Sequence, residues 1–150
     1  METPEYTPGP LARKKGQLYN SPEKEVEKIK LTIDGREIEA EKGLNVLEAA
    51  RLAGIEIPSL CYLRQINEIG SCRVCLVEVE ARGARTIQAA CVYPATAGLV
   101  VHTSSPRVRR VRKTIVELLL SDHHRECTTC IRNLNCELQN LADNLGIRNI

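Results

Sequence analysis

The stretch that decides the fold covers residues 57–79 and reads IPSLCYLRQINEIGSCRVCLVEV. It contains Cys61, Cys72 and Cys75, and Cys91 follows after a further gap of 15 residues. The segment that leads to Cys75 shows neither helical nor strand periodicity, whereas the residues after it alternate in polarity as a half-buried strand does. The pattern therefore predicts an irregular loop that brings several thiols to the ends of strands.

These four thiols are candidate metal ligands. One close C-x2-C pair with two more distant members resembles the spacing of plant-type [2Fe–2S] ferredoxins, although the first gap is longer here. Gly70 and Ser71 are small, so backbone N–H groups beside them can approach sulfide. The alternative is a structural zinc site, but zinc modules usually carry two close pairs. The spacing favours a [2Fe–2S] cluster on Cys61, Cys72, Cys75 and Cys91.

A second cysteine group follows near the carboxyl end of the sequence, where Cys127, Cys130 and Cys136 are separated by gaps of two and five residues. Three thiolates leave a cubane cluster one ligand short, and either His123 or His124 can supply the fourth bond. Spacing alone does not choose between the two histidines. It also leaves two kinds of centre open, a [4Fe–4S] cluster and a Cys3His zinc site.

The residues around the first group predict a small α+β sheet with a helix on one face. Strands are expected over 28–33 and 36–40, joined by the tight turn Asp34–Gly35. Asn45 is expected to cap a helix that ends at Gly54. Further strands are expected over residues 76–80, 85–90 and 99–103.

The remainder of the sequence is predicted to be helical. Ser105 and Pro106 are suited to start a helix that continues to about Asp122, and Gly146 ends a short closing helix. We therefore expect three parts: an extended tail that is disordered or orders on a partner, a ferredoxin-like domain, and a small helical domain that holds the second centre. Their expected bounds are 1–27, 28–104 and 105–150.

Composition narrows the class of protein. The 150 residues include seven cysteines, an odd number that cannot all pair as disulfides. Residues 1–10 show no secretory signal, and the longest aliphatic run is too short to span a bilayer. We expect a soluble chain in a reducing, cytoplasmic compartment, with no direct membrane insertion. The net charge of only +2 predicts no general polyanion-binding surface.

The basic residues are nevertheless concentrated in one segment, at Arg107, Arg109, Arg110, Arg112 and Lys113. A solvated helix face is the favoured interpretation. The alternatives are a docking surface, a nucleic-acid contact, or compensation of a negative metal centre, to which Arg73 between the close cysteine pair would also contribute. His102 has no neighbouring cysteine and is interpreted as an ordinary surface residue.

The sequence predicts no catalytic residues. It contains no Gly-rich phosphate loop, and no nucleophilic set remains once the cysteines are ligands. The favoured hypothesis is an electron carrier whose cofactors supply the chemistry. Two alternatives remain, a zinc-containing nucleic-acid module that uses the basic segment and an iron–sulfur redox sensor.

The motifs resemble a known group of proteins. Pro58-Ser59-Leu60-Cys61-Tyr62, Gly70-Ser71-Cys72-Arg73-Val74-Cys75, Ala90-Cys91-Val92-Tyr93-Pro94 and Asn135-Cys136-Glu137-Leu138-Gln139 carry the likeness. They resemble the amino-terminal iron–sulfur region of [FeFe] hydrogenases. They are equally similar to the large iron–sulfur subunit of respiratory complex I and to the diaphorase iron–sulfur subunit of NAD-linked [NiFe] hydrogenases. The likeness covers about residues 28–147.

This resemblance implies a β-grasp domain with a [2Fe–2S] cluster, followed by a [4Fe–4S] cluster whose H-x3-C spacing selects His123. The implied function is electron transfer within a hetero-oligomeric NAD(H)-linked oxidoreductase, most closely a hydrogenase, including the electron-bifurcating type. The implied partners are a flavoprotein NAD(H)-binding subunit and a catalytic subunit, with no nucleic acid. No cysteine remains for the further clusters of most relatives, so we expect no site where hydrogen, formate or quinone reacts.

Overall fold

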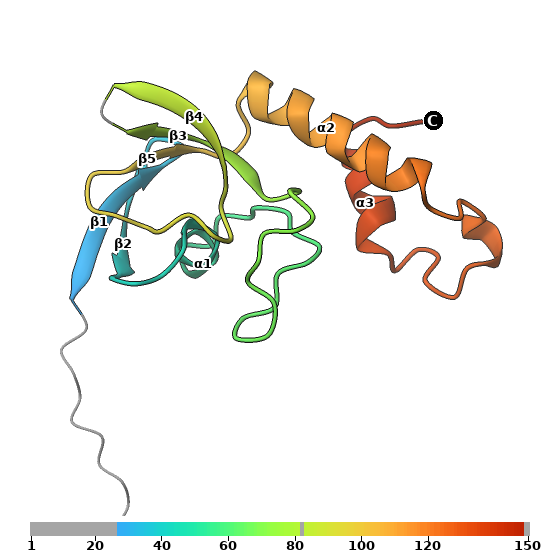
Figure 1. Ribbon diagram of the computed structural model, residues 1–150, viewed down its shortest axis with the longest axis horizontal. Coiled ribbons are helices and arrows are strands. Elements are labelled where there is room, and N and C mark those ends of the chain that lie inside the picture. Colours follow the sequence, from blue (N-terminus) through green and yellow to red (C-terminus); the bar gives the residue numbers. More distant parts are fainter. Residues whose placement is uncertain (1–26, 82, 149–150) are drawn as a thin grey trace, which may run out of the picture.

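The computed structural model describes residues 27–81 and 83–148. The predicted extended tail, except for its last residue, lies outside these residues. Within them the chain forms five strands, three α-helices and one 3-10 turn, which Figure 1 shows as a sheet followed by a helical part. The elements are β1 (Lys28–Ile33), β2 (Arg36–Glu41), α1 (Val46–Leu52), β3 (Leu76–Ala81), β4 (Ala84–Ala89), β5 (Val100–His102), α2 (Pro106–Ser121), η1 (Cys127–Thr129) and α3 (Glu137–Asn144).

The first two strands form the predicted hairpin. Asp34 and Gly35 have φ values of +49° and +78°, and positive φ at both central residues is typical of the turn that matches the twist of paired strands. The Asp34 carboxylate also accepts hydrogen bonds from the backbone N–H and the hydroxyl of Thr103, at 2.8 and 2.5 Å. The turn is thereby tied to the end of β5, 69 residues along the chain.

The sheet is mixed, with strand order β2-β1-β5-β3-β4. The pair formed by β1 and β5 is parallel, and the other three pairs of this sheet are antiparallel. Alternation in β1 buries Ile29, Leu31 and Ile33 in one hydrophobic core, which also contains the fully buried Leu47 of α1. The core is therefore aliphatic, as a chain with few aromatic residues requires, and the α+β prediction is confirmed.

Helix α1 is capped as the sequence predicts. The side-chain oxygen of Asn45 accepts a hydrogen bond from the backbone N–H of Glu48 at 2.9 Å. The amide nitrogen of the same residue donates to the Tyr62 hydroxyl at 3.1 Å. Asn45 therefore fixes both the start of α1 and the cysteine-bearing loop that follows it.

The helical part packs through a second, smaller core. Val74 of the loop, Val116 of α2 and Ile147 after α3 are buried together, and Leu138 and Leu141 of α3 pack against them. Ser105 caps α2 by accepting from Val108 N–H at 3.3 Å, and Pro106 stands in the first turn, as predicted. Within the described residues, no helix combines the length and the apolar character needed to cross a membrane.

The double role of Asn45 gives a first prediction. The substitution Asn45→Ala removes both the cap and the bond to Tyr62, and each is worth about 1 kcal/mol. We expect it to lower the free energy of unfolding of the metal-free chain by about 2 kcal/mol in urea denaturation. The control Tyr62→Phe keeps the cap but removes the bond to Asn45 together with the interaction of the hydroxyl with Glu48, and it should cost less than Asn45→Ala. Equal losses in the two variants would show that the cap contributes nothing.

Candidate metal centres

The first four cysteines meet at the ends of the loop between α1 and β3. Cys61 lies in the loop, Cys75 lies directly before β3, and Cys91 follows β4. The backbone N–H of Cys72 donates to the Cys61 sulfur at 3.4 Å, and Cys91 interacts electrostatically with the other three thiols. The structure therefore brings together the four side chains that the sequence predicts as one ligand set.

Their environments are unequal. Burial raises the pKa of the Cys91 thiol to about 12, and neighbouring Cys75, Cys61 and Cys72 act in the same direction. Burial also acts to raise the pKa of Cys72, but N–H groups of Val74 and Leu60 and a bond from Cys61 together hold that pKa below its ordinary value. A thiolate surrounded by N–H donors is the form in which cysteine binds metal. The surroundings of Cys72 therefore favour the thiolate more than those of Cys91 do.

The loop is braced by contacts that the sequence did not indicate. The amide of Asn67 donates to the Cys61 carbonyl at 2.8 Å, and the backbone of Asn67 pairs with Leu63. Gln65 and Arg73 have positive φ, which non-glycine residues adopt only at a cost. Arg73, expected to help compensate a negative centre, is exposed to solvent. These constraints hold the irregular loop in one shape.

Gly70 lies where the loop passes closest to Cys91. Its φ is +65°, and a β-carbon there would lie 3.1 Å from Val92 Cγ1 and 3.7 Å from the Cys91 sulfur. The small residue that the sequence singled out is thus required by both backbone conformation and space. A side chain at this position would lie in van der Waals contact with the buried sulfur of Cys91.

The second cysteine group lies in a loop at the far end of α2. Cys127 and Cys130 are exposed and joined by a backbone bond of 3.2 Å across η1, and Cys136 stands at the N-terminus of α3. The backbone N–H of Arg132 donates to the Cys130 sulfur at 3.4 Å. Gln139 of α3 braces the loop, because its side chain accepts from Leu134 N–H and donates to Asn133.

The structure does not gather this second group as it gathers the first. His123 and His124 are both exposed, and the backbone of His123 closes the end of α2 by donating to Leu120 at 3.2 Å. Among residues 27–81 and 83–148, no three His, Cys, Asp or Glu side chains converge as a single-ion site would require, and this holds for the first group as well as for the second. All seven cysteines lie in this described part and are free thiols. The choice between the two histidines remains a prediction.

Two sequence interpretations need correction. Arg107, Arg109 and Arg110 are exposed as expected of a solvated face, but Arg112 on the same helix is buried, with 6% of its surface exposed. Arg112 lies on the face of the helix that meets the core, whereas Arg109 and Arg110 face solvent. One member of a run of basic residues is therefore buried. His102 is half-buried rather than exposed. Its Nε2 atom is buried, makes no hydrogen bond and lies 3.8 Å from a carboxylate oxygen of Glu80.

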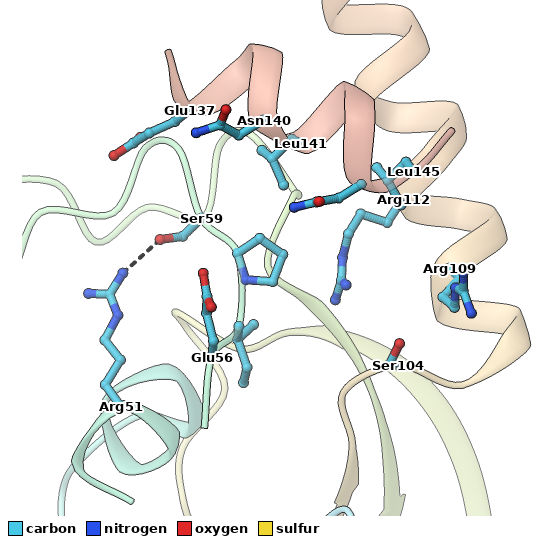
Figure 2. Close-up of a pocket in the computed structure, with 13 residues that line it drawn as sticks. Arg51, Glu56, Ser59, Ser104, Arg109, Arg112, Glu137, Asn140, Leu141 and Leu145 are labelled. Atoms are coloured by element: carbon cyan, nitrogen blue, oxygen red, sulfur yellow. Dashed lines mark hydrogen bonds between the residues drawn. The ribbon is translucent and has the colours of Figure 1, made fainter. Parts of the chain in front are cut away.

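A cleft of about 570 Å³ separates the loop from the helical part. Figure 2 shows Arg51, bonded to Ser59 at 2.8 Å, on one side and Asn140 of α3 on the other. Arg112 extends from α2 into the same region, toward the loop and the strands. The two cysteine groups thus belong to parts of the chain that meet around this cleft.

Family models match nearly the whole described chain. Residues 26–106 match the 2Fe-2S iron-sulfur cluster binding domain. Residues 112–150 match the NADH-ubiquinone oxidoreductase-G iron-sulfur binding region. The first match contains Cys61, Cys72, Cys75 and Cys91, and the second contains His123, Cys127, Cys130 and Cys136.

Similar proteins are large redox subunits. NADP-reducing hydrogenase subunit HndD of Solidesulfovibrio fructosivorans is 45% identical over 125 residues, which is 80% of this chain and 21% of that protein. The NADPH-Fe(3+) oxidoreductase alpha subunit of Geobacter sulfurreducens is 42% identical over 79% of this chain and 14% of its own length. The mitochondrial NADH-ubiquinone oxidoreductase 78 kDa subunit of Candida albicans is 35% identical over 91% of this chain and 19% of its own length. The chain thus spans about a fifth or less of these relatives.

A solved structure agrees with these matches. In the crystal structure of NAD+-reducing [NiFe]-hydrogenase in the H2-reduced state, one chain is 39% identical and superposes with a TM-score of 0.72, over 80% of this chain and 50% of that chain. The expected ferredoxin-like domain followed by a 4Fe-4S binding region is confirmed. The chain belongs to the 2Fe-2S iron-sulfur cluster binding domain family, and the NADH-ubiquinone oxidoreductase-G iron-sulfur binding region follows that domain.

Proposed function

We propose that the chain is the electron-transfer iron–sulfur part of a multisubunit NAD(H)-linked oxidoreductase. The observation that supports this most strongly is the meeting of four thiols, separated by up to 30 residues of sequence, around one loop. No other set of described side chains offers comparable chemistry. The proposed first centre is one [2Fe–2S] cluster held by Cys61, Cys72, Cys75 and Cys91.

The residues present fit such a cluster. Thiolates are its usual ligands, and N–H donation to sulfur is one of the ways a protein adjusts its potential. Cys72 N–H already points at a sulfur, and Gly70 keeps the space beside Cys91 free of a side chain. When bound, such a cluster supplies reversible one-electron transfer, and the chain's residues hold, shield and charge-balance it.

The proposed second centre is one [4Fe–4S] cluster held by His123, Cys127, Cys130 and Cys136. The Arg132 N–H directed at the Cys130 sulfur supports a metal-binding loop there. A neutral imidazole in place of one thiolate makes such a centre less negative and raises its potential, as histidine does in Rieske centres. The electronic difference between the centres would then come from ligand type.

The division of the chain follows from these assignments. We propose a tail over 1–27, a [2Fe–2S] domain over 28–104 and a [4Fe–4S] domain over 105–150. With no reactive set in the described residues besides the cysteines, the role is that of a relay. The proposed partners are a flavoprotein NAD(H)-binding subunit and a catalytic subunit, most closely of a hydrogenase, including the bifurcating type. The proposed complex is cytoplasmic.

Spectroscopy of single-site variants tests the two centres. The chain purified without oxygen and reduced with dithionite should give two distinct iron–sulfur signals by electron paramagnetic resonance. His123→Ala should remove or alter only the second signal, and His123→Cys should retain it at a lower potential because the centre becomes more negative. The matched control His124→Ala should change neither signal. A colourless protein that contains zinc, or loss of the second signal only in the His124 variant, would contradict these assignments.

Gly70 supplies a test of the first centre. Gly70→Ala imposes an L-residue on a positive φ and places a methyl group against Val92. The control Gly98→Ala meets the same conformational cost, at a φ of +74°, but with nothing within 4 Å of the new carbon. We expect the free energy of unfolding of Gly70→Ala to be about 1 kcal/mol below that of the control. We also expect Gly70→Ala to retain less iron in the first centre than the control does.

The crowding at Gly70 should be relieved by a second substitution. Val92→Ala removes the atoms that the new methyl group meets, so the double variant Gly70→Ala/Val92→Ala should regain iron relative to Gly70→Ala alone. The measurement is iron per chain at the first centre, from the intensity of its reduced signal. Equal iron retention in the Gly70 and Gly98 variants would show that close approach to Cys91 is not needed.

A further inference from the structure

Arg112 makes three hydrogen bonds from α2, two to the carbonyls on either side of Cys75 and one to the end of β5. Its Nε donates to the Val74 carbonyl at 3.0 Å, and its Nη2 donates to the carbonyls of Leu76 and Thr103 at 2.6 and 3.1 Å. Val74 and Leu76 are the two residues that flank Cys75. The guanidinium therefore lies beside the backbone of Cys75, a proposed cluster ligand.

The charge of this side chain has no carboxylate partner in the described ranges. The buried Glu78 on the neighbouring strand pairs with Arg107 instead, at 3.6 Å. The three acceptors of Arg112 are neutral carbonyls. Arginine does not deprotonate in proteins, so a full positive charge is held in the interior. Burying such a charge carries a large desolvation cost unless an anion offsets it.

A cluster at the cysteine site would supply the offsetting negative charge, because two of the three hydrogen bonds of Arg112 go to the carbonyls on either side of Cys75. Burial lowers the pKa of Arg112, whereas the charge of Cys75 acts to raise it. The exposed basic residues of the same helix have solvent and salt around them, which screen their charge. Arg112 differs from them because its field reaches the cysteines through protein rather than water.

We propose that Arg112 is the buried counter-charge that sets the reduction potential of the first centre. This inference rests on the proposed [2Fe–2S] assignment. Reduction by a low-potential one-electron donor, such as a partner flavin or dithionite, adds one negative charge to the centre and takes up no proton. A fixed cation nearby stabilises that added charge, so Arg112 makes the centre easier to reduce. Arg112 is a positioning residue and not a ligand.

Three variants separate charge from structure. Arg112→Gln removes the cation and keeps hydrogen-bond donors. Arg112→Lys keeps the cation but loses the planar guanidinium and its arrangement of N–H donors. Arg110→Gln removes an exposed cation from the same helix. The measurement is a redox titration of the dithionite-reducible first signal by electron paramagnetic resonance. We expect Arg112→Gln to lower the equilibrium constant for reduction at least tenfold, which is about 59 mV for one electron. Arg112→Lys and Arg110→Gln should each stay within about threefold of wild type.

The outcomes distinguish this inference from the function on which it rests. A wild-type chain without an iron–sulfur signal overturns the proposed function, and the inference with it. An intact signal whose potential is unchanged in Arg112→Gln overturns the inference alone. If Arg112→Gln does not fold, Arg112→Lys decides: a preserved potential supports the charge role, and a tenfold fall contradicts it. A purely structural role predicts equal shifts in both Arg112 variants.

Discussion

Three hydrogen bonds from the buried guanidinium of Arg112 connect the two parts of the molecule. They join α2 to the carbonyls on either side of Cys75 and to the end of β5. Thr103, one of these acceptors, is itself bonded to the Asp34 turn of the first hairpin. A single side chain thus links the sheet, the cysteine loop and the helix that leads to the second cysteine group. Because a buried charge without partners is costly, this arrangement tolerates little displacement.

The sheet and the loop have complementary roles. The aliphatic core of β1, β3, β5 and α1 supplies a rigid support, on which Cys75 and Cys91 lie at strand ends, both buried. The loop that carries Cys61 gains its shape from polar contacts, through Asn45 with Tyr62 and through Asn67. The strand ends and the loop thereby place ligands that are far apart in the sequence at one site. The second group lies in an exposed loop braced by Gln139.

Much of the fold could be predicted from local signals. Alternation in β1, the Asp34–Gly35 turn and the caps at Asn45 and Ser105 each depend on neighbouring residues, and each is confirmed. The first ligand set followed from cysteine spacing, and the structure brings its members together. Contacts between distant segments could not be predicted. Helical spacing places Arg112 four residues from both Val108 and Val116, on the buried face of α2, and Arg110 on the opposite face. The sequence does not show that this face meets the carbonyls beside β3, which Arg112 binds. The low exposure of His102 has the same origin.

Iron-edge anomalous scattering from a crystal of the chain, grown without oxygen, tests the central claim most directly. The account predicts a pair of iron peaks among Cys61, Cys72, Cys75 and Cys91, and a separate compact group of iron peaks beside Cys127, Cys130, Cys136 and one histidine. Peaks at the zinc edge in either place would contradict it. Empty thiols in protein that had not been exposed to oxygen or a chelator would also contradict it. The sulfurs of Cys61, Cys72, Cys75 and Cys91 would then be brought together for another purpose.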